Sequence, residues 1–227
     1  MTAAWLLLSV TLAADPVVAA DEWSAPDPAW EVDIDPLAAN SLTHWTSTER
    51  AALDRGEAVS RHWSDSKGRA KGMSAVVVNT SADALWRVIV DFDAYVEFFP
   101  YVTASYTTRW EEAADHTHIL AGYQLTTMGV NTRYRLDNRW YPDRGVLMFE
   151  VLPEGSGPIS TGAGWWRVSP WSKGSVLLEY SVDMATQWWV PSVLERKAAS
   201  RLPTVVRTTK RRAETTSAAA HRGTARP

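Results

Sequence analysis

The sequence of 227 residues contains no cysteine and only 4 phenylalanines, against 13 tryptophans and 7 tyrosines. Without cysteine, disulfide bonds, thiolate nucleophiles and cysteine-based zinc or iron–sulfur sites are excluded. The excess of tryptophan favours a pocket wall or a boundary between apolar and wet surfaces, because indole is large, stiff and amphipathic. An ordinary core rich in tryptophan is the alternative interpretation.

The sequence also lacks a strong charge of either sign, with a formal net charge of -3 and a pI of about 6.0. This balance favours neither nucleic acid nor an anionic membrane as a partner. The chain contains neither a Gly-x-Ser-x-Gly nucleophile elbow nor a phosphate-binding glycine loop. We therefore expect no nucleic-acid partner and no cofactor.

The N-terminal apolar run is short. Residues 3–14 (AAWLLLSVTLAA) are too few for a stable membrane anchor but match the apolar region of a signal peptide. Small residues ahead of Asp21 predict cleavage after Ala20 and export to the periplasm or the extracellular space. Because no Lys or Arg precedes the run, a weakly helical or disordered tail is the alternative.

Composition divides the rest of the chain into three parts. Residues 21–41 are acidic and interrupted by prolines, which predicts an extended linker. Residues 42–213 carry the periodic patterns of a single folded domain. The Ala/Thr/Ser-rich residues 214–227 predict a disordered tail.

Within the domain, capping residues and alternating patterns predict a series of elements. Thr46 or Ser47 begins a short helix, and Thr80 with Asp83 forms a capping box before a second helix. The expected helices lie at 46–53, 81–91 and 94–99. The expected strands lie at 57–63, 72–79, 101–110, 116–127, 130–141, 146–151, 164–169 and 176–184.

The clearest strand is the segment 130–141. Apolar residues such as Tyr134 and Leu136 alternate with charged ones such as Arg133 and Arg135. This period of two predicts one face toward an apolar interior and one solvated face. The arginines are therefore expected in water and not in a reactive pocket.

The last predicted element is a long helix that starts at Pro191. Leu194, Ala198 and Leu202 follow at intervals of four residues and form an apolar stripe, and Pro203 is expected to kink the helix. One-sided antiparallel strands need a cover, and only this helix is long enough. The fold class is therefore α+β, with a curved antiparallel sheet of about six to seven strands around a long C-terminal helix and a pocket between them.

Several motifs add a family resemblance to this architecture. The segment 75–102 reads AVVVNTSADALWRVIVDFDAYVEFFPYV, and residues 164–170 read GWWRVSP. In the first segment a predicted strand is followed by a predicted helix and then by a turn; the matching positions are Trp86, Val88, Asp91, Phe92, Tyr95, Phe98 and Pro100. In this order they resemble the START-like (SRPBCC) superfamily over roughly residues 42–213, near the Coq10-type coenzyme Q-binding and polyketide cyclase-like branch. The resemblance implies the helix-grip fold. It leaves function open, because members bind, carry or transform very different ligands.

The strand and helix faces indicate which side chains line the pocket. The candidate ligand-binding residues are Phe98, Phe99, Tyr123, Tyr134, Leu136, Phe149, Trp166, Tyr180, Leu194, Ala198 and Leu202. For any one of them, ordinary core packing is an equal alternative. We propose no catalytic residue and no metal site from the sequence.

Two clusters of titratable residues are candidates for chemical sites. His116 and His118 point the same way on a strand, but no third metal ligand has a recognisable spacing, so a solvent-facing strand end is expected. Asp91, Asp93 and Glu97 are acidic neighbours for which helix capping and a solvated face are the simpler interpretation.

The preferred function is non-catalytic binding or carriage of a lipid, quinone or similar apolar molecule by a monomer. The alternatives are a polyketide cyclase, aromatase or dehydrase, which needs convergent polar groups in the pocket, and an interaction module that uses Trp188 and Trp189. The basic residues 210–212 are expected to neutralise a helix end, with transient contact to anionic lipid headgroups as the alternative.

Overall fold

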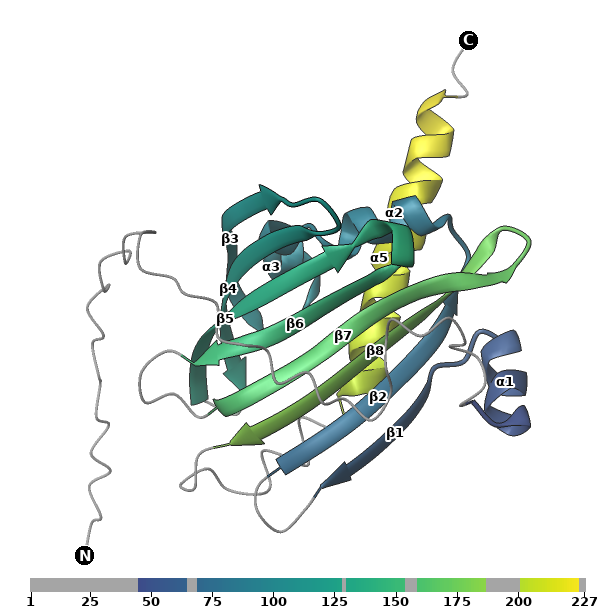
Figure 1. Ribbon diagram of the computed structural model, residues 1–227. Helices are drawn as coiled ribbons and strands as arrows, with labels where there is room; N and C mark the ends of the chain where they lie inside the picture. Colours follow the sequence, from purple (N-terminus) through teal and green to yellow (C-terminus); the bar gives the residue numbers. More distant parts are fainter. Residues whose placement is uncertain (1–44, 65–68, 128–129, 154–158, 187–200, 225–227) are drawn as a thin grey trace, which may run out of the picture.

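Figure 1 shows the protein as a computed structural model that describes residues 45–64, 69–127, 130–153, 159–186 and 201–224. The strands are β1 (Val59–Ser64), β2 (Arg69–Val78), β3 (Val102–Glu112), β4 (Thr117–Thr127), β5 (Val130–Tyr141), β6 (Val146–Pro153), β7 (Ile159–Ser172) and β8 (Ser175–Thr186). The helical elements are α1 (Ser47–Asp54), α2 (Ala82–Ile89), η3 (Phe92–Ala94), α3 (Tyr95–Phe98), η4 (Pro142–Arg144) and α5 (Leu202–Thr224).

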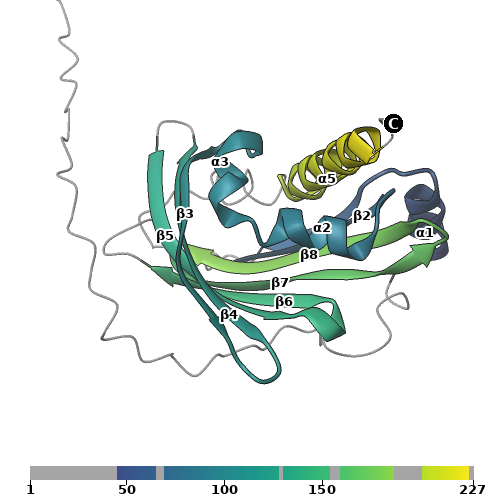
Figure 2. The same cartoon turned by 90° about the horizontal axis from the view of Figure 1, so that it is seen from above.

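All eight strands join in one antiparallel sheet, in the order β1-β2-β8-β7-β6-β5-β4-β3. Figure 2 shows α2, α3 and α5 on the same side of this curved sheet, which we call its inner face. The opposite side is the outer face, and α1 packs there against β1 and β2. The predicted α+β helix-grip architecture is confirmed, with one strand more than the upper end of the expected range.

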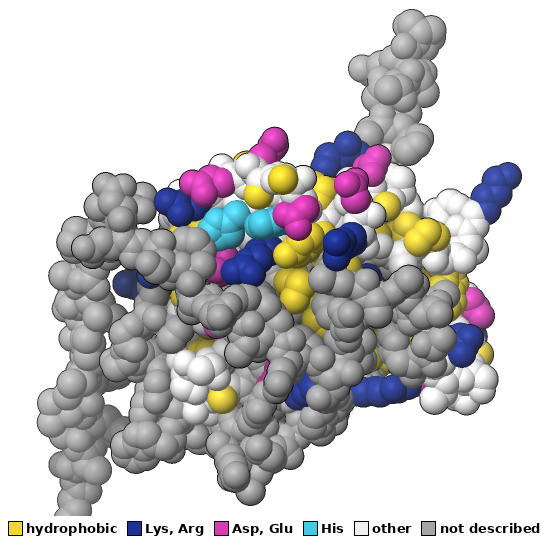
Figure 3. Space-filling model, viewed as in Figure 1, with side chains coloured by type: hydrophobic (Ala, Val, Ile, Leu, Met, Phe, Trp, Pro, Cys, Tyr) yellow, Lys and Arg dark blue, Asp and Glu magenta, His cyan; other side chains and the backbone are white. Residues whose placement is uncertain are grey.

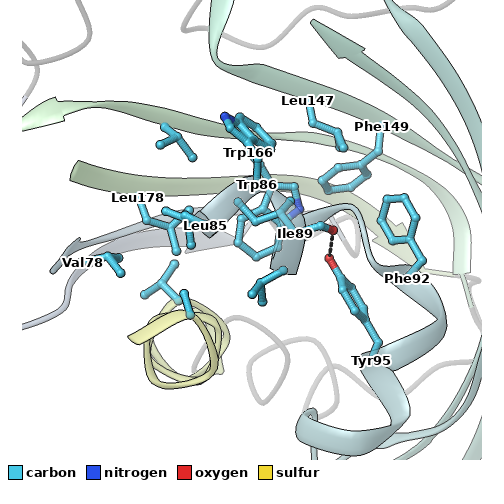
Figure 4. Packing of buried hydrophobic residues seen from close by; sticks show 14 of the residues in the cluster. Val78, Leu85, Trp86, Ile89, Phe92, Tyr95, Leu147, Phe149, Trp166 and Leu178 are labelled. Atoms are coloured by element: carbon cyan, nitrogen blue, oxygen red, sulfur yellow. Dashed lines mark hydrogen bonds between the residues drawn. The ribbon is translucent and has the colours of Figure 1, made fainter. Parts of the chain in front are cut away.

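Each face of the sheet carries its own core. The inner core joins α2 to the sheet, as Figure 4 shows for Leu85, Trp86 and Ile89 of α2 beside Leu147 and Trp166. The outer core is formed by Trp45, Leu53, Val59, Met73, Ala75, Val77, Val146, Met148, Trp165 and Leu177. The central strands are therefore apolar on both faces, which is more typical of a sheet covered on both sides than of a one-sided sheet.

The register of β5 matches the alternation in its sequence. Tyr134 and Leu136 pack against the inner core, and Arg133 is exposed, so the predicted faces are correct. Arg135 and Arg139 are half-buried and not fully solvated as predicted. Arg139 stands between the buried residues His118 of β4 and Met148 of β6, and Arg135 stands opposite Leu152 of β6, so the stems of both arginines can pack on the outer face.

The helix caps follow the sequence for α1 but not for α2. Thr46, one of the two predicted caps, begins α1 and forms a capping box with Glu49: the Glu49 amide donates to Thr46 Oγ1 at 3.2 Å and the Thr46 amide donates to Glu49 Oε2 at 2.8 Å. In α2 the predicted cap at Thr80 is wrong, since Ser81 Oγ accepts from the Ala84 amide. The Thr80 hydroxyl instead bonds Ser217 of α5 at 2.7 Å.

The middle of helix α5 is hydrogen-bonded to the end of β2 and to the residues that follow it. Lys210 Nζ donates to the Val77 carbonyl at 2.8 Å, and Glu214 Oε1 accepts from the Asn79 amide at 2.9 Å. These bonds and the Thr80–Ser217 contact hold a segment that extends beyond residue 213. The predicted disordered tail from residue 214 is therefore wrong as far as Thr224, where α5 ends.

Pro203 occupies the first turn of α5, where its missing amide breaks no intrahelical bond. The predicted helical stretch over residues 191–200, the leader at 1–20 and the linker at 21–41 lie outside the described residues. Within the described ranges, no helix combines the length and the apolar character needed to cross a bilayer.

Candidate functional site

The inner face gathers four tyrosines, each from a different element. Tyr95 of α3, Tyr123 of β4, Tyr134 of β5 and Tyr180 of β8 form what we call the tyrosine cluster. The rings of Tyr95 and Tyr123 lie 5.8 Å apart between centroids, and those of Tyr123 and Tyr134 stack at 5.6 Å. Tyr95, Tyr123 and Tyr134 are thus joined by ring contacts, and Tyr180 lies on the same inner face in contact with Phe149 and Trp166.

Strand register explains why these rings meet. Tyr123 stands directly opposite Tyr134, and Trp166 directly opposite Tyr180, so each pair shares the inner face. The Trp166 and Tyr180 rings are 4.3 Å apart between centroids, and Phe149 stacks on Tyr180 at 6.0 Å.

Gly164 makes room for this arrangement. A Cβ atom built on Gly164 would lie 2.4 Å from Phe149 Cζ and 2.2 Å from the Ser181 carbonyl oxygen. Both approaches are shorter than van der Waals contact, so the Phe149 ring lies across bare backbone that no other residue type provides.

Burial sets the ionisation of the tyrosine cluster. It raises the pKa of Tyr95, Tyr123, Tyr134 and Tyr180 above the ordinary value of 10.0, and neighbouring tyrosine hydroxyls raise that of Tyr123 further. All four phenols are therefore neutral at physiological pH and act as hydrogen-bond donors rather than as bases.

The hydroxyls of two neighbouring tyrosines differ in their partners. Tyr95 Oη donates to the Ile89 carbonyl at 2.6 Å, the bond drawn as a dashed line in Figure 4. Tyr123 is 5% exposed, and its buried hydroxyl has no hydrogen-bond partner among the described residues. The cluster thus contains one satisfied and one unsatisfied buried donor.

A second group of polar atoms lies at the other end of the inner face, near α2. The Trp140 ring contacts Trp86 of α2 at 5.8 Å and Trp110 of β3 at 6.4 Å between centroids. Asn138 donates to the carbonyls of Ile119 and Leu136, both at 3.0 Å. Within the described part of the chain, Trp140 Nε1 and Asn138 Oδ1 have no partner.

Most of the predicted ligand-binding residues come together on the inner face. Buried members of the inner core are Tyr123, Phe149, Trp166 and Leu202. Half-buried residues packed against it are Phe98, Phe99, Tyr134, Leu136 and Tyr180. Leu194 and Ala198 lie outside the described residues. Contact of any of them with a ligand stays a prediction.

A buried ion pair, Arg167 with Glu179, lies on the outer face, and the sequence analysis did not predict it. Arg167 Nε donates to Glu179 Oε2 at 2.8 Å, and the Trp45 indole donates to Glu179 Oε1 at 2.8 Å. Glu179 is fully buried, although its position opposite the apolar face of β8 indicates solvent. The apolar residues Met73 and Leu177 at outer positions were the signal of a covered outer face.

The prediction that the histidine pair faces solvent is wrong for His118. His118 is not solvent-facing, since it is 9% exposed and its Nε2 lies 2.6 Å from Asp137 Oδ1, also buried. His116 is half-buried and pairs with Asp115 at 2.8 Å. In Figure 3 the histidines appear together, beside acidic and basic side chains. Among the described residues, no group of three or more potential ligands is placed to hold a metal ion.

The curved sheet, the helices on its inner face and the aromatic lining between them define a helix-grip protein of the START-like superfamily. Residues 78–207 match the family described as "Polyketide cyclase / dehydrase and lipid transport". The chain belongs to this family, and the resemblance inferred from the sequence is confirmed. By its description, the family spans both enzymes and transport proteins.

Solved structures share this fold at low sequence identity. The Zhui aromatase/cyclase from Streptomyces sp. R1128 is 17% identical, with a TM-score of 0.53 over 69% of this chain and 94% of that one. A START superfamily protein from Mycobacterium smegmatis is 16% identical, with a TM-score of 0.52 over 70% and 99%. An 18 kDa protein from Caulobacter crescentus is 18% identical, with a TM-score of 0.52 over 65% and 98%. No curated protein matches the sequence.

Proposed function

We propose that the protein binds or carries a hydrophobic small molecule, such as a lipid or quinone, without chemically changing it. The ligand would lie between the inner face of the sheet and the N-terminal part of α5. The observation that carries this proposal is the tyrosine cluster, a broad aromatic surface whose members Tyr134 and Tyr180 are only half-buried. A mostly apolar lining with a few polar groups is typical of small-molecule sites.

The placement of the ionisable groups supports a carrier over a cyclase. The pairs Arg167–Glu179 and His118–Asp137 belong to the outer face, away from the aromatic lining. General acid–base catalysis requires a group that titrates near the working pH, and burial moves the inner-face phenols further from it. The polar atoms that the described residues bring to the inner face suit hydrogen bonding to a bound molecule.

The basic run at residues 210–212 is largely engaged within the fold. Lys210 bonds Val77 and Glu214, and Arg212 bonds Glu97 at 2.6 Å, while Arg211 is exposed. This arrangement favours the anchoring of α5 over a lipid-binding patch. Any contact with a membrane surface would be transient and would use few charges.

The binding function is tested with a neutral apolar dye, N-phenyl-1-naphthylamine, whose fluorescence rises in apolar surroundings. We expect saturable binding by the purified protein and an apolar compound in its organic extract, identified by mass spectrometry. Trp166, which contacts Tyr180, provides an energy-transfer donor within the site. Unsaturable dye binding together with a ligand-free extract would reject the proposal.

We also propose export with cleavage after Ala20, on the strength of the apolar run at residues 3–14 and the small residues before Asp21. N-terminal sequencing of the protein from a periplasmic fraction should begin at Asp21. Recovery of an intact Met1 from the cytoplasm would contradict this proposal.

A further inference from the structure

We infer that the ligand carries a neutral carbonyl oxygen, and that this oxygen accepts a hydrogen bond from the hydroxyl of Tyr123. The inference rests on the proposed binding function and adds the chemical class of the ligand to it. Its basis is the combination of a deeply buried donor, a neighbouring donor that is already satisfied, and aromatic surroundings.

The Tyr123 hydroxyl is a buried donor without a partner. Tyr123 is 5% exposed, and no described residue accepts from its hydroxyl. Buried hydroxyls are nearly always hydrogen-bonded in folded proteins, so the unpaired hydroxyl of Tyr123 is unusual. A ligand atom that accepts this bond would remove the penalty of the unpaired donor on binding.

The hydroxyl of the neighbouring Tyr95, unlike that of Tyr123, already has a hydrogen-bond partner within the fold. The ring of Tyr95 lies 5.8 Å from that of Tyr123, and it is buried to a similar degree. Its hydroxyl, however, donates to the Ile89 carbonyl at 2.6 Å. The two tyrosines therefore form a natural pair for comparison, one with a structural bond and one with a hydroxyl still available.

The surroundings of Tyr123 select a neutral acceptor. Its ring is flanked by Phe92 at 6.3 Å, Tyr95 at 5.8 Å and Tyr134 at 5.6 Å between centroids. The inner core around it consists of hydrophobic residues, whereas the Arg167 guanidinium belongs to the outer face. Burying an ionised carboxylate here without a cation would be costly, but a ketone, aldehyde or ester oxygen suits a phenolic donor.

The test compares 2-undecanone with undecane as competitors of N-phenyl-1-naphthylamine, on the wild type, Tyr123→Phe and Tyr95→Phe. Because the two compounds differ only in the carbonyl group, the ratio of their affinities measures the contribution of that group to binding. We expect Tyr123→Phe to weaken ketone binding by about threefold to tenfold relative to the alkane, the effect of one hydrogen bond. Tyr95→Phe should leave the ratio unchanged, because its hydroxyl is bonded to Ile89.

Circular dichroism first establishes that each variant is folded. A second measurement needs no variant: the infrared stretch of carbonyl-labelled 2-undecanone bound to the wild type should shift below its frequency in hexane. An unchanged ratio in folded Tyr123→Phe, an equal change in both variants, or an unshifted carbonyl stretch would overturn the inference and leave the binding function standing. Failure of both competitors to displace the dye from the wild type would overturn the binding function as well.

Discussion

Arg167 and Glu179 form an ion pair on the outer face, with 2.8 Å between Arg167 Nε and Glu179 Oε2, and their side chains are 5% and 0% exposed. The Trp45 indole donates to the other carboxylate oxygen, and the Arg167 guanidinium lies 5.0 Å from the Trp165 ring centroid. Because Trp45 immediately precedes the cap of α1, this pair couples α1 to the centre of the sheet.

Breaking this pair should be strongly destabilising. Glu179→Gln leaves the Arg167 guanidinium buried without its counter-charge, which costs about 3–5 kcal/mol of the free energy of unfolding. Urea denaturation followed by tryptophan fluorescence measures the loss. The matched control, Arg167→Met with Glu179→Leu, removes both charges and should recover most of it. A single variant as stable as the wild type would show that the carboxylate is not buried in solution.

The pH dependence of α1 follows from Glu49. Its hydrogen bonds to Arg61 lower its pKa from the ordinary 4.5 to about 2, against the opposing effect of burial. A depressed folded-state pKa means that the stabilisation is fully present above pH 4.5 and is lost as the pH falls toward 2. Glu49→Gln should remove this acid-sensitive component, on the order of 1 kcal/mol because Arg61 is partly exposed.

Acid titration of the free energy of unfolding, from pH 6 to about pH 2, checks this prediction. Glu57→Gln is the control, since its carboxylate pairs with Arg55 at the surface, with both side chains more than half exposed. If both substitutions change the free energy of unfolding equally at acid pH, the Glu49–Arg61 pair is not the source of the acid-sensitive stability.

The anchoring of α5 predicts different effects for two adjacent basic residues. Lys210→Met removes a bond to the Val77 carbonyl and a contact with Glu214, which should cost about 1–3 kcal/mol of stability. Arg211→Met changes an exposed side chain and should stay within about 0.5 kcal/mol of the wild type. Hydrogen exchange should show faster opening of α5 in the first variant alone. Equal exchange in both would mean that apolar packing, not Lys210, holds the helix.

The sequence pattern predicts some of the buried positions of the sheet and not others. Alternation in β5 predicts the inner positions of Tyr134 and Leu136, because a strand has only two faces. It does not predict the burial of Glu179 or Asp137, since a charged residue at an outer position ordinarily indicates water. That interpretation fails here because apolar side chains such as Met73 cover the outer face as well.

The details of the helices depend on contacts between distant residues. Thr80 and Ser81 are equally good caps from the sequence, and the hydroxyl of Ser217 in α5 decides between them by engaging Thr80. The same bond, together with Glu214, keeps helical a segment whose composition favours disorder. The unpaired hydroxyl of Tyr123 has no counterpart in any sequence pattern, because satisfaction of a donor is a property of packing.

The final prediction concerns the rate at which a ligand leaves. Two cation–π contacts lie between the α5 region and the α3 region. The guanidinium of Arg201, the residue before α5, lies 3.7 Å from the ring centroid of Tyr101 in the turn after α3, and that of Arg212 in α5 lies 5.5 Å from the ring of Phe98 in α3. Arg212 also pairs with Glu97 at 2.6 Å, but both side chains are more than a third exposed, so the pair adds little to global stability. If the ligand lies between the inner face and α5, these contacts bridge one side of its enclosure.

Arg212→Gln should therefore speed release of N-phenyl-1-naphthylamine by about threefold to tenfold, the effect expected for losing one partly exposed cation–π contact and its ion pair. The free energy of unfolding should fall by a similar amount, about 0.6–1.4 kcal/mol, because unfolding breaks the same contacts. Stopped-flow dilution measures the rate, and raising the salt concentration should accelerate release from the wild type more than from the variant, because screening weakens the Arg212–Glu97 attraction. Arg207→Gln, at an exposed position of the same helix, is the control and should leave the rate unchanged. A wild-type rate in Arg212→Gln would show that the ligand leaves by a route that does not separate α3 from α5.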